Sequence, residues 1–227
     1  MARFVVTIDG PAGSGKSTAA RLLASRLDAT FLDTGATYRA VTLAAIRDGA
    51  DLGDPRQLVE VIERHRFDFM AAKGKMLVRI DGQDVTDAIR DNELTAKVRH
   101  VAAAALVRGK LVEMQRAFAA RCSRVVTEGR DQGTVAFPDA AVKVYLTADA
   151  AERARRRMAE LAAGGADADL DQIRREIESR DRSDENRAVG PLKPAADAIT
   201  VDTTGLSIEQ VVEQLYLIVE ERCPQRY

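Results

Sequence analysis

One segment of the sequence has the residue types and the spacing of a phosphate-binding loop. Residues 10–17 read GPAGSGKS, which matches the pattern GxxxxGK(S/T). Glycines let backbone N–H groups turn inward around a phosphate, the lysine reaches the β- and γ-phosphate oxygens, and the serine hydroxyl is a ligand for Mg²⁺. We therefore predict that ATP or GTP binds here with Mg²⁺, and the sequence has no NKxD guanine-reading motif. The predicted contacts are Gly10, Pro11, Ala12, Gly13, Ser14, Gly15, Lys16, Ser17 and Thr18, with Lys16 catalytic and Ser17 on the metal.

Charged residues follow a second hydrophobic run that has the composition of a strand. Residues 125–127 read VVT, and Glu128, Arg130 and Asp131 come directly after this run. Ligands of open α/β sheets bind beside the carboxyl ends of the strands, so we expect these side chains at the ligand site. A phosphate loop alone is compatible with a motor, a switch, an ATPase or a kinase. The charged cluster favours phosphoryl transfer over nucleotide binding alone.

Several arginines are spaced so that they would face the phosphates of a ligand. Arg39 is expected in the first turn of a helix that begins near Gly35, and a planar guanidinium suits a phosphoryl dianion. A surface arginine would leave the same pattern.

Two later helices also carry arginines at helical spacing. The charged residues are Arg153, Arg156 and Arg157 in the first helix and Arg180, Asp184 and Arg187 in the second, residues 170–187. In the first helix the like charges share one face and repel, which suits a site for a polyanion. In the second, Ile173 and Ile177 would face inward. We predict a lid that brings arginines to the transferring phosphoryl group, and the alternative is a solvated helix with salt bridges.

The elements that must hold these residues alternate between strands and helices. β-Branched runs predict strands and apolar residues at helical spacing predict helices. The strands are expected at 4–8, 124–128, 142–146 and 198–202, and helices at 17–27 and 208–219. This order predicts an α/β fold, the three-layer P-loop fold, with a parallel central sheet that helices cover on both faces.

Between residues 67 and 85 the pattern changes to short strands separated by turn signals. Lys73-Gly74 and Asp81-Gly82 mark the turns, and the runs beside them predict a small antiparallel meander. We expect an insertion, about 66–86, that closes over a substrate; a decorative hairpin would leave the same pattern. The Ala/Gly-rich stretch 162–168 predicts a flexible connection between helices.

The composition fits one domain with an insertion. The 227 residues are 46% hydrophobic and 30% charged with a net charge of −1, so no global field draws the chain to nucleic acid or a membrane. No apolar run is long enough for a membrane span or a signal-peptide core. Cys122 and Cys223 form no metal motif or disulfide framework, and His65 and His100 lie in no ligand cluster. We therefore expect a cytoplasmic protein without structural zinc.

A set of motifs resembles those of bacterial cytidylate (CMP) kinases, in the nucleoside monophosphate (NMP) kinase group, over nearly the whole chain. The motifs are IDGP at 8–11, LDTGA at 32–36, YRA at 38–40, EGRD at 128–131, GTV at 133–135, FPDA at 137–140, ERARRR at 152–157 and RAV at 187–189. The resemblance implies a monomer. Its regions would be a core at 1–35, 122–150 and 190–227, an NMP-binding region at about 36–121 and a helical lid at about 151–189.

The resemblance also implies a reaction and roles for individual residues. ATP would phosphorylate CMP or dCMP to CDP or dCDP by direct in-line transfer. Arg39, Arg130 and Arg187 would hold the acceptor phosphate. The other substrate-binding residues would be Thr34, Arg99, Arg108, Asp131, Arg180 and Asp184, with Arg180 and Asp184 near the ribose and Arg108 and Asp131 at the base. The catalytic residues would be Lys16, Arg130, Arg157 and Arg187.

Three positions depart from the family pattern. Arg99 stands where members usually have a serine that contacts the base, and Thr37 and Gln132 replace apolar residues. All three lie beside acceptor-site motifs rather than the phosphate loop, so they bear on the choice of base and not on ATP. Two alternatives stay open: a kinase for another or a modified nucleoside monophosphate, and a nucleotide-binding regulatory protein with the same fold.

Overall fold

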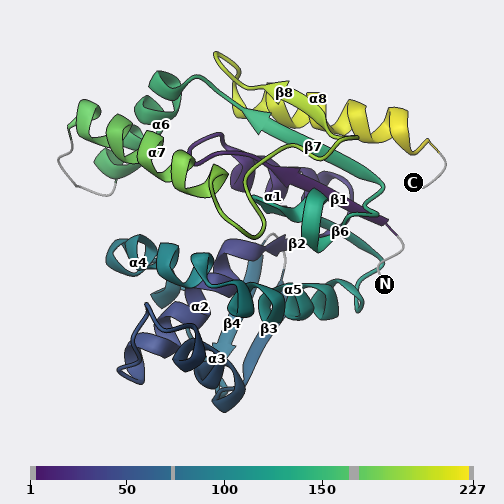
Figure 1. Ribbon diagram of the computed structural model, residues 1–227. Coiled ribbons are helices and arrows are strands. Elements are labelled where there is room, and N and C mark those ends of the chain that lie inside the picture. Colours follow the sequence, from purple (N-terminus) through teal and green to yellow (C-terminus); the bar gives the residue numbers. More distant parts are fainter. Residues whose placement is uncertain (1–3, 73–74, 164–168, 225–227) are drawn as a thin grey trace.

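The computed structural model of the protein describes residues 4–72, 75–163 and 169–224. Five parallel strands form the central sheet in the order β2-β6-β1-β7-β8 (Figure 1). They are β1 (Phe4–Asp9), β2 (Thr30–Asp33), β6 (Arg124–Gly129), β7 (Val142–Thr147) and β8 (Ile199–Asp202). The parallel sheet that the sequence predicts is therefore confirmed.

Helices follow most of these strands along the chain. They are α1 (Lys16–Arg26), α2 (Thr34–Arg47), α3 (Pro55–Arg64), α4 (Asn92–Ala103), α5 (Ala105–Ala119), α6 (Ala150–Ala163), α7 (Leu170–Glu185) and α8 (Ile208–Arg222), with the short turns η1 (Ala88–Arg90) and η2 (Gln132–Ala136). No helix within the described residues is long and apolar enough to cross a membrane.

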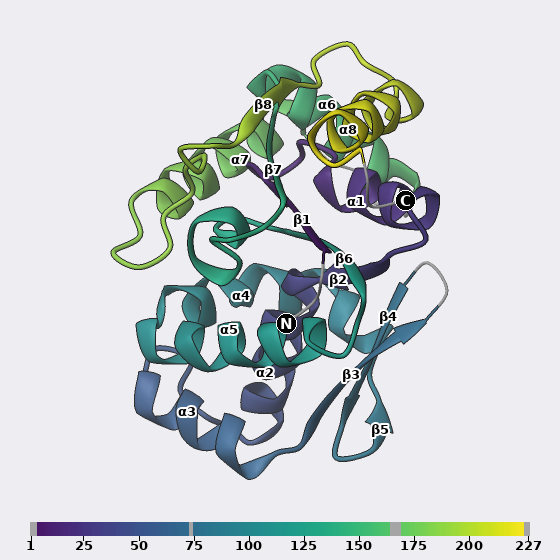
Figure 2. The same ribbon diagram turned by 90° about the vertical axis from the view of Figure 1, so that its right-hand side faces the viewer.

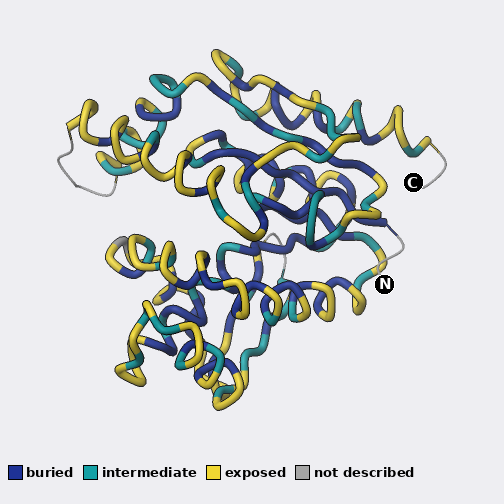
Figure 3. The backbone as a smooth tube through the Cα atoms, viewed as in Figure 1, coloured by how far each residue is buried: buried dark blue, intermediate teal, exposed yellow. Residues whose placement is uncertain are grey.

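The alternating side chains of β1 explain why helices cover both faces of the central sheet. Val6 and Ile8 pack with α1 and α8, whereas Val5 packs with α2 and α5 on the opposite face. Successive side chains of a strand point to opposite faces, so a strand buried on both faces reads as an almost continuous apolar run. All of β1 is buried, and Figure 3 shows the central strands as the most buried part of the molecule. The three layers therefore follow from the sequence of the strands.

A second, antiparallel sheet packs beside α2 and confirms the predicted meander (Figure 2). It consists of β3 (Phe67–Ala72), β4 (Lys75–Ile80) and β5 (Gln83–Asp84). Phe67 pairs with Ile80, and Asp81 and Gly82 form the β4–β5 turn with φ angles of 51° and 82°. Positive φ is the conformation that glycine adopts without strain. The other predicted turn, Lys73-Gly74, lies outside the described residues.

His65 joins this second sheet to the helices beside it. Its Nδ1 lies 2.6 Å from Asp81 Oδ2 in the β4–β5 turn, and its Nε2 lies 3.0 Å from Asp48 Oδ1 after α2. Hydrogen bonding to Asp81 raises the pKa of His65, and burial acts in the opposite direction. A protonated His65 therefore links two carboxylates from different elements.

Helices α6 and α7 form a hairpin at one side of the molecule (Figure 1). Its apolar core is small, consisting of Ala154, Ile173 and Ile177 with Met158 and Leu161 beside them. The predicted inward orientation of Ile173 and Ile177 is confirmed. Of the predicted connection at 162–168, residues 164–168 lie outside the described residues. Polar contacts must therefore contribute much of what holds this hairpin in place.

Candidate active site

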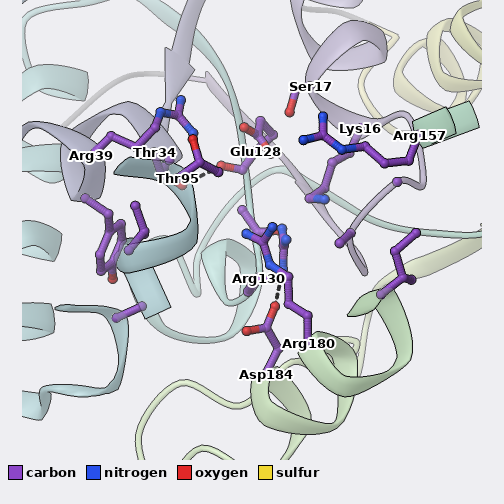
Figure 4. A pocket seen from close by; sticks show the side chains of 18 of the residues that line it. Lys16, Ser17, Thr34, Arg39, Thr95, Glu128, Arg130, Arg157, Arg180 and Asp184 are labelled. Carbon is purple, nitrogen blue, oxygen red and sulfur yellow. Dashed lines mark hydrogen bonds and ion pairs between the residues drawn. The ribbon is translucent and has the colours of Figure 1, made fainter. Parts of the chain in front are cut away.

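A cavity of about 660 Å³ lies where β1, β2 and β6 end and where the α6–α7 hairpin approaches the sheet. Figure 4 shows Arg39 and Thr34 on one side of it, Lys16 and Arg157 on the other, and Arg130 between them, with Arg180 and Asp184 below Arg130. Most of the predicted site residues line this cavity. They are Ala12, Gly13, Gly15, Lys16, Ser17, Thr18, Thr34, Arg39, Arg108, Arg130, Asp131, Arg157, Arg180, Asp184 and Arg187.

The phosphate loop connects β1 to α1 with the geometry that the glycines allow. Gly10, Gly13 and Gly15 have φ angles of 155°, 75° and 81°. A Cβ atom at Gly10 would overlap the carbonyl oxygen of Leu146 on the neighbouring strand. Only glycine therefore fits at this position. Gly15 is the residue before α1, so the loop ends at a helix N-terminus, where N–H groups are available to an anion.

Lys16 is buried beside this loop, and its surroundings make its ammonium group easier to deprotonate. Its Nζ donates a hydrogen bond of 2.8 Å to the carbonyl oxygen of Pro11. Burial, followed by the positive charge of Arg130, lowers the pKa of Lys16 to about 7, although Glu128 acts to raise it. A polyphosphate would supply the negative charge that this buried cation lacks.

The side of the cavity formed by β6 and α7 is an arginine cluster around one carboxylate. Arg130 Nε donates to Asp184 Oδ2 at 2.7 Å, and Arg187 donates to Asp184 Oδ1. Burial acts to raise the pKa of Asp184, but the charges of Arg130 and Arg187 outweigh it and lower that pKa. Arg180 makes no hydrogen bond or ion pair with another described residue, and burial, followed by the charge of Arg130, lowers its pKa to about 10. The cluster has more positive than negative charge and suits an anion.

Arg39 reaches the cavity from α2 but lies in the second turn of that helix rather than the predicted first. The helix begins at Thr34 because Asp33 caps it, accepting from the Ala36 N–H at 2.9 Å. The same carboxylate accepts from Arg39 Nη2 at 3.0 and 3.1 Å. Arg39 Nε is buried with no partner among the described residues. This free donor suits an oxyanion of a ligand.

Arg108 and Asp131 both line the cavity and form a buried ion pair. Arg108 Nη1 also donates to the Ala102 carbonyl at 3.2 Å, whereas its Nε has no partner in the described chain. Gly190 lies against the pair with a φ of 61°, and a Cβ atom there would overlap both Arg108 Nη2 and Asp131 Oδ2. Burial raises the pKa of the adjacent Tyr38 to about 12, so its phenol stays protonated. The pair is thus enclosed on several sides.

The sequence reasoning placed four residues at the site that do not line the cavity. They are Gly10, Pro11, Ser14 and Arg99. The first three shape the phosphate loop. Arg99 is exposed on α4, where its Nε donates to His100 Nε2 at 3.4 Å. The resemblance implies that Arg99 binds substrate, but Arg99 does not line the cavity, to which α4 presents Thr95, Ala96 and Val98.

The prediction that Arg153, Arg156 and Arg157 together await a polyanion is wrong for the first two. Arg153 is bound to protein groups, including Asp181 at 2.5 Å. Arg156 Nη2 donates to the Thr203 carbonyl at 2.6 Å. Arg157 does line the cavity and pairs with the exposed Glu160 at 3.1 Å. Spacing along a helix cannot reveal partners that other elements supply.

A buried polar network behind the cavity includes both remaining departures from the family pattern. Thr37 accepts from Gln115 Nε2 at 3.0 Å, and Gln132 Oε1 accepts from Thr127 at 3.1 Å. The two halves meet where Gln132 Nε2 donates to Gln115 Oε1 at 3.5 Å. All four residues are at most 2% exposed. Thr37 and Gln132 are thus connected by hydrogen bonds through Gln115, and neither of them lines the cavity.

Sequence reasoning missed Asp181, a buried residue of α7. It follows Ile173 and Ile177 at steps of four, so it lies on the inward stripe of the helix. A carboxylate on such a stripe needs a buried partner. That spacing was the available signal, and the partner is Arg153 of α6.

The fold and the cavity together define a P-loop phosphotransferase. A phosphate loop between a parallel strand and a helix faces an arginine-rich pocket, which is the arrangement such enzymes use to bring two anionic substrates together. The chain belongs to the cytidylate kinase family, whose model matches residues 6–221.

Comparisons with individual proteins agree with this assignment. The chain is 45% identical to the cytidylate kinase of Rhodococcus jostii, covering 97% of this chain and 96% of that protein. It is 47% identical to the cytidylate kinase of Stutzerimonas stutzeri, covering 96% of each. Among solved structures, an uncharacterized protein from Eubacterium ventriosum has a TM-score of 0.51 at 9% identity, covering 96% of this chain and 98% of that one. This structural likeness concerns the fold alone.

Proposed function

We propose that this chain transfers the γ-phosphoryl group of ATP to CMP or dCMP and forms CDP or dCDP. The observation that carries the proposal is that the phosphate loop, Arg39 and the cluster of Arg130, Arg180 and Arg187 line one cavity. Relatives named cytidylate kinase, at 45% and 47% identity over nearly the whole chain, support CMP as the acceptor. The acceptor and the donor would then meet with their phosphates between the loop and the arginines.

The reaction is a direct in-line transfer. An oxygen of the acceptor phosphate attacks the γ-phosphorus, the bond from that phosphorus to the bridging oxygen breaks, and the electron pair leaves with ADP. The second pKa of a phosphate monoester is about 6, so the acceptor is already a dianion near neutral pH and needs no strong general base. Lys16, Arg130, Arg157 and Arg187 stabilise the charge that spreads over the transferring group.

Mg²⁺ fits the phosphate end of the cavity. The Ser17 hydroxyl and the Glu128 carboxylate both line the cavity beside Lys16. Mg²⁺ usually binds one or two protein oxygens together with substrate phosphates and waters. When bound, it neutralises charge on the β- and γ-phosphate oxygens. Ser17 would hold the ion, as the position of a serine after the loop lysine predicts.

Arg108 and Asp131 would read the acceptor base. A carboxylate accepts a hydrogen bond from the exocyclic amine of cytosine, whereas uracil presents a carbonyl oxygen at the same place. The unpartnered Nε of Arg108 supplies a donor beside it. CMP should therefore be preferred over UMP. Arg180 and Asp184 would contact the ribose, with Thr34 and Arg39 on the opposite side of the cavity.

The proposed function also assigns a role to each region of the fold. The core would comprise 1–35, 122–150 and 190–227, with an NMP-binding region at about 36–121 and a lid at about 151–189. The lid is the α6–α7 hairpin, which carries Arg157, Arg180 and Asp184. Closing it over the substrates would exclude water and limit hydrolysis of ATP.

An acceptor panel tests the proposal. Purified protein with ATP and Mg²⁺ is given CMP, dCMP, UMP, AMP and a cytidine monophosphate modified on the base, and both ADP and the diphosphate product are measured. We expect CDP from CMP with a higher kcat/KM than for UMP, and no product with the variant Lys16→Ala. A clearly higher kcat/KM with another monophosphate would replace CMP as the acceptor, and ADP without any diphosphate would refute the transfer.

A further inference from the structure

A buried ion pair joins the α6–α7 hairpin to the phosphate loop. Arg153 of α6 and Asp181 of α7 are each 7% exposed, and Arg153 Nη1 lies 2.5 Å from Asp181 Oδ2. The same Nη1 donates to the Ala12 carbonyl at 3.0 Å, and Asp181 Oδ1 accepts from the Ala12 N–H at 3.3 Å. The pair therefore binds both backbone polar groups of one phosphate-loop residue.

The backbones of the loop and of α6 are also in direct contact at this point. A Cβ atom on Gly13 would lie 3.1 Å from Arg153 Cβ and 3.3 Å from the Arg153 carbonyl oxygen. Arg153 Nε donates to the Ala148 carbonyl at 3.0 Å, which fixes the guanidinium from the other side. The loop therefore packs directly against the first turn of α6 at Arg153.

Neither member of the pair lines the cavity, so neither contacts a substrate there. Asp181 is nevertheless adjacent in sequence to Arg180 and is three residues before Asp184, and both of these line the cavity. The hairpin has a small apolar core of its own, formed around Ala154, Ile173 and Ile177. The position of Arg180 relative to the phosphate loop therefore depends on polar contacts, and the contact at Ala12 is the one that reaches the loop itself; Arg130–Asp184 and Arg156–Thr203 join the hairpin to other parts of the core.

We propose that Arg153 and Asp181 are positioning residues that hold the lid arginines in register with the phosphate loop. The proposal rests on the function proposed above. Removing one member of a buried ion pair leaves an uncompensated charge, whereas removing both leaves none. The two single variants and the double variant therefore separate loss of the link from loss of the fold.

The experiment uses the full chain and compares Asp181→Leu, Arg153→Met, the double variant and Arg174→Met. Arg174→Met is the matched control, because it removes an exposed i,i+4 ion pair with Glu178 from the same helix. Hydrogen–deuterium exchange of α7 and of the phosphate loop is measured without nucleotide. Steady-state kinetics then give kcat, KM for ATP and for CMP, and the ratio of ATP hydrolysed to CDP formed.

We expect faster exchange in α7 and the loop for all three variants of the pair, and exchange unchanged from wild type for Arg174→Met. In the three variants of the pair, kcat should fall about tenfold or more, because the lid arginines lose their alignment with the phosphate loop. The ratio of ATP hydrolysed to CDP formed should rise about tenfold, because water enters the active site. A merely structural role would lower the amount of active protein without changing that ratio.

The double variant keeps the proposal falsifiable if a single variant does not fold. Wild-type exchange and a wild-type ratio of hydrolysis to transfer in the double variant would overturn it. Failure of the wild-type chain and of Arg174→Met to form CDP would instead refute the proposed function, and exchange in the nucleotide-free protein would still decide whether the pair links the lid to the loop.

Discussion

Binding of ATP should draw a proton onto Lys16 near neutral pH. In the free protein, burial and the charge of Arg130 lower the pKa of this lysine to about 7. The phosphates of ATP bring negative charge to the amine and raise its pKa in the complex. Because the bound state binds the proton more tightly, binding takes up a proton, and the affinity falls as the pH rises above about 7.

The expected uptake follows from the fraction of neutral Lys16 in the free protein. With a pKa of about 7, the number of protons taken up per ATP bound is about 0.1 at pH 6, about 0.5 at pH 7 and about 0.9 at pH 8. The apparent dissociation constant of ATP should therefore rise by up to about tenfold per pH unit on the alkaline side.

Isothermal titration calorimetry measures this uptake when one titration is repeated in buffers with different ionisation enthalpies. Lys16→Arg is the control, because a guanidinium keeps the positive charge and stays protonated throughout this pH range. We expect the pH-dependent uptake in the wild type and its loss in Lys16→Arg. Equal uptake by both proteins at pH 8 would refute the assignment to Lys16.

Three further predictions concern the acceptor side and the second sheet. Arg130→Ala should lower kcat/KM for CMP by about a hundredfold and change the dissociation constant of ATP less than about threefold. A selective loss of ATP binding in calorimetry would contradict a role of Arg130 on the acceptor side. Gln132→Met should lower the free energy of unfolding in urea by about 1–3 kcal/mol, because it leaves buried polar partners unsatisfied, and an unchanged midpoint would show that they re-pair. Because its pKa is raised, His65 should stabilise the fold below about pH 6.5 and lose this contribution as the pH rises through the folded-state pKa. Urea unfolding at pH 5.5 and 8.5 should therefore show a smaller difference in unfolding free energy between wild type and His65→Gln at the higher pH. An equal difference at both pH values would refute this prediction.

Local chemistry explains which parts of the fold could be predicted. The strand at Phe4–Asp9 and the phosphate loop after it are specified by neighbouring residues, and so are the β4–β5 turn and the inward stripe of α7. The start of α2 was misplaced by one residue because a side-chain cap at Asp33 overrides the glycine at 35.

Contacts between distant segments explain what could not be predicted. Arg156 pairs with Thr203, and Arg153 with Asp181, across gaps in sequence that no helical periodicity reports. The family resemblance implies a substrate contact for Arg99, but on α4 its side chain is exposed to solvent. The connection of Thr37 to Gln132 through Gln115 likewise depends on how three elements meet. Residue type thus indicated the chemistry, whereas tertiary packing decided which side chains take part.

The close approach of Gly190 to the Arg108–Asp131 pair has a consequence for selectivity. A single methyl group at this position would act as a wedge between the two charges that would read the base. In the proposed function, discrimination between pyrimidines would then depend on the absence of a side chain at residue 190, as well as on Arg108 and Asp131 themselves.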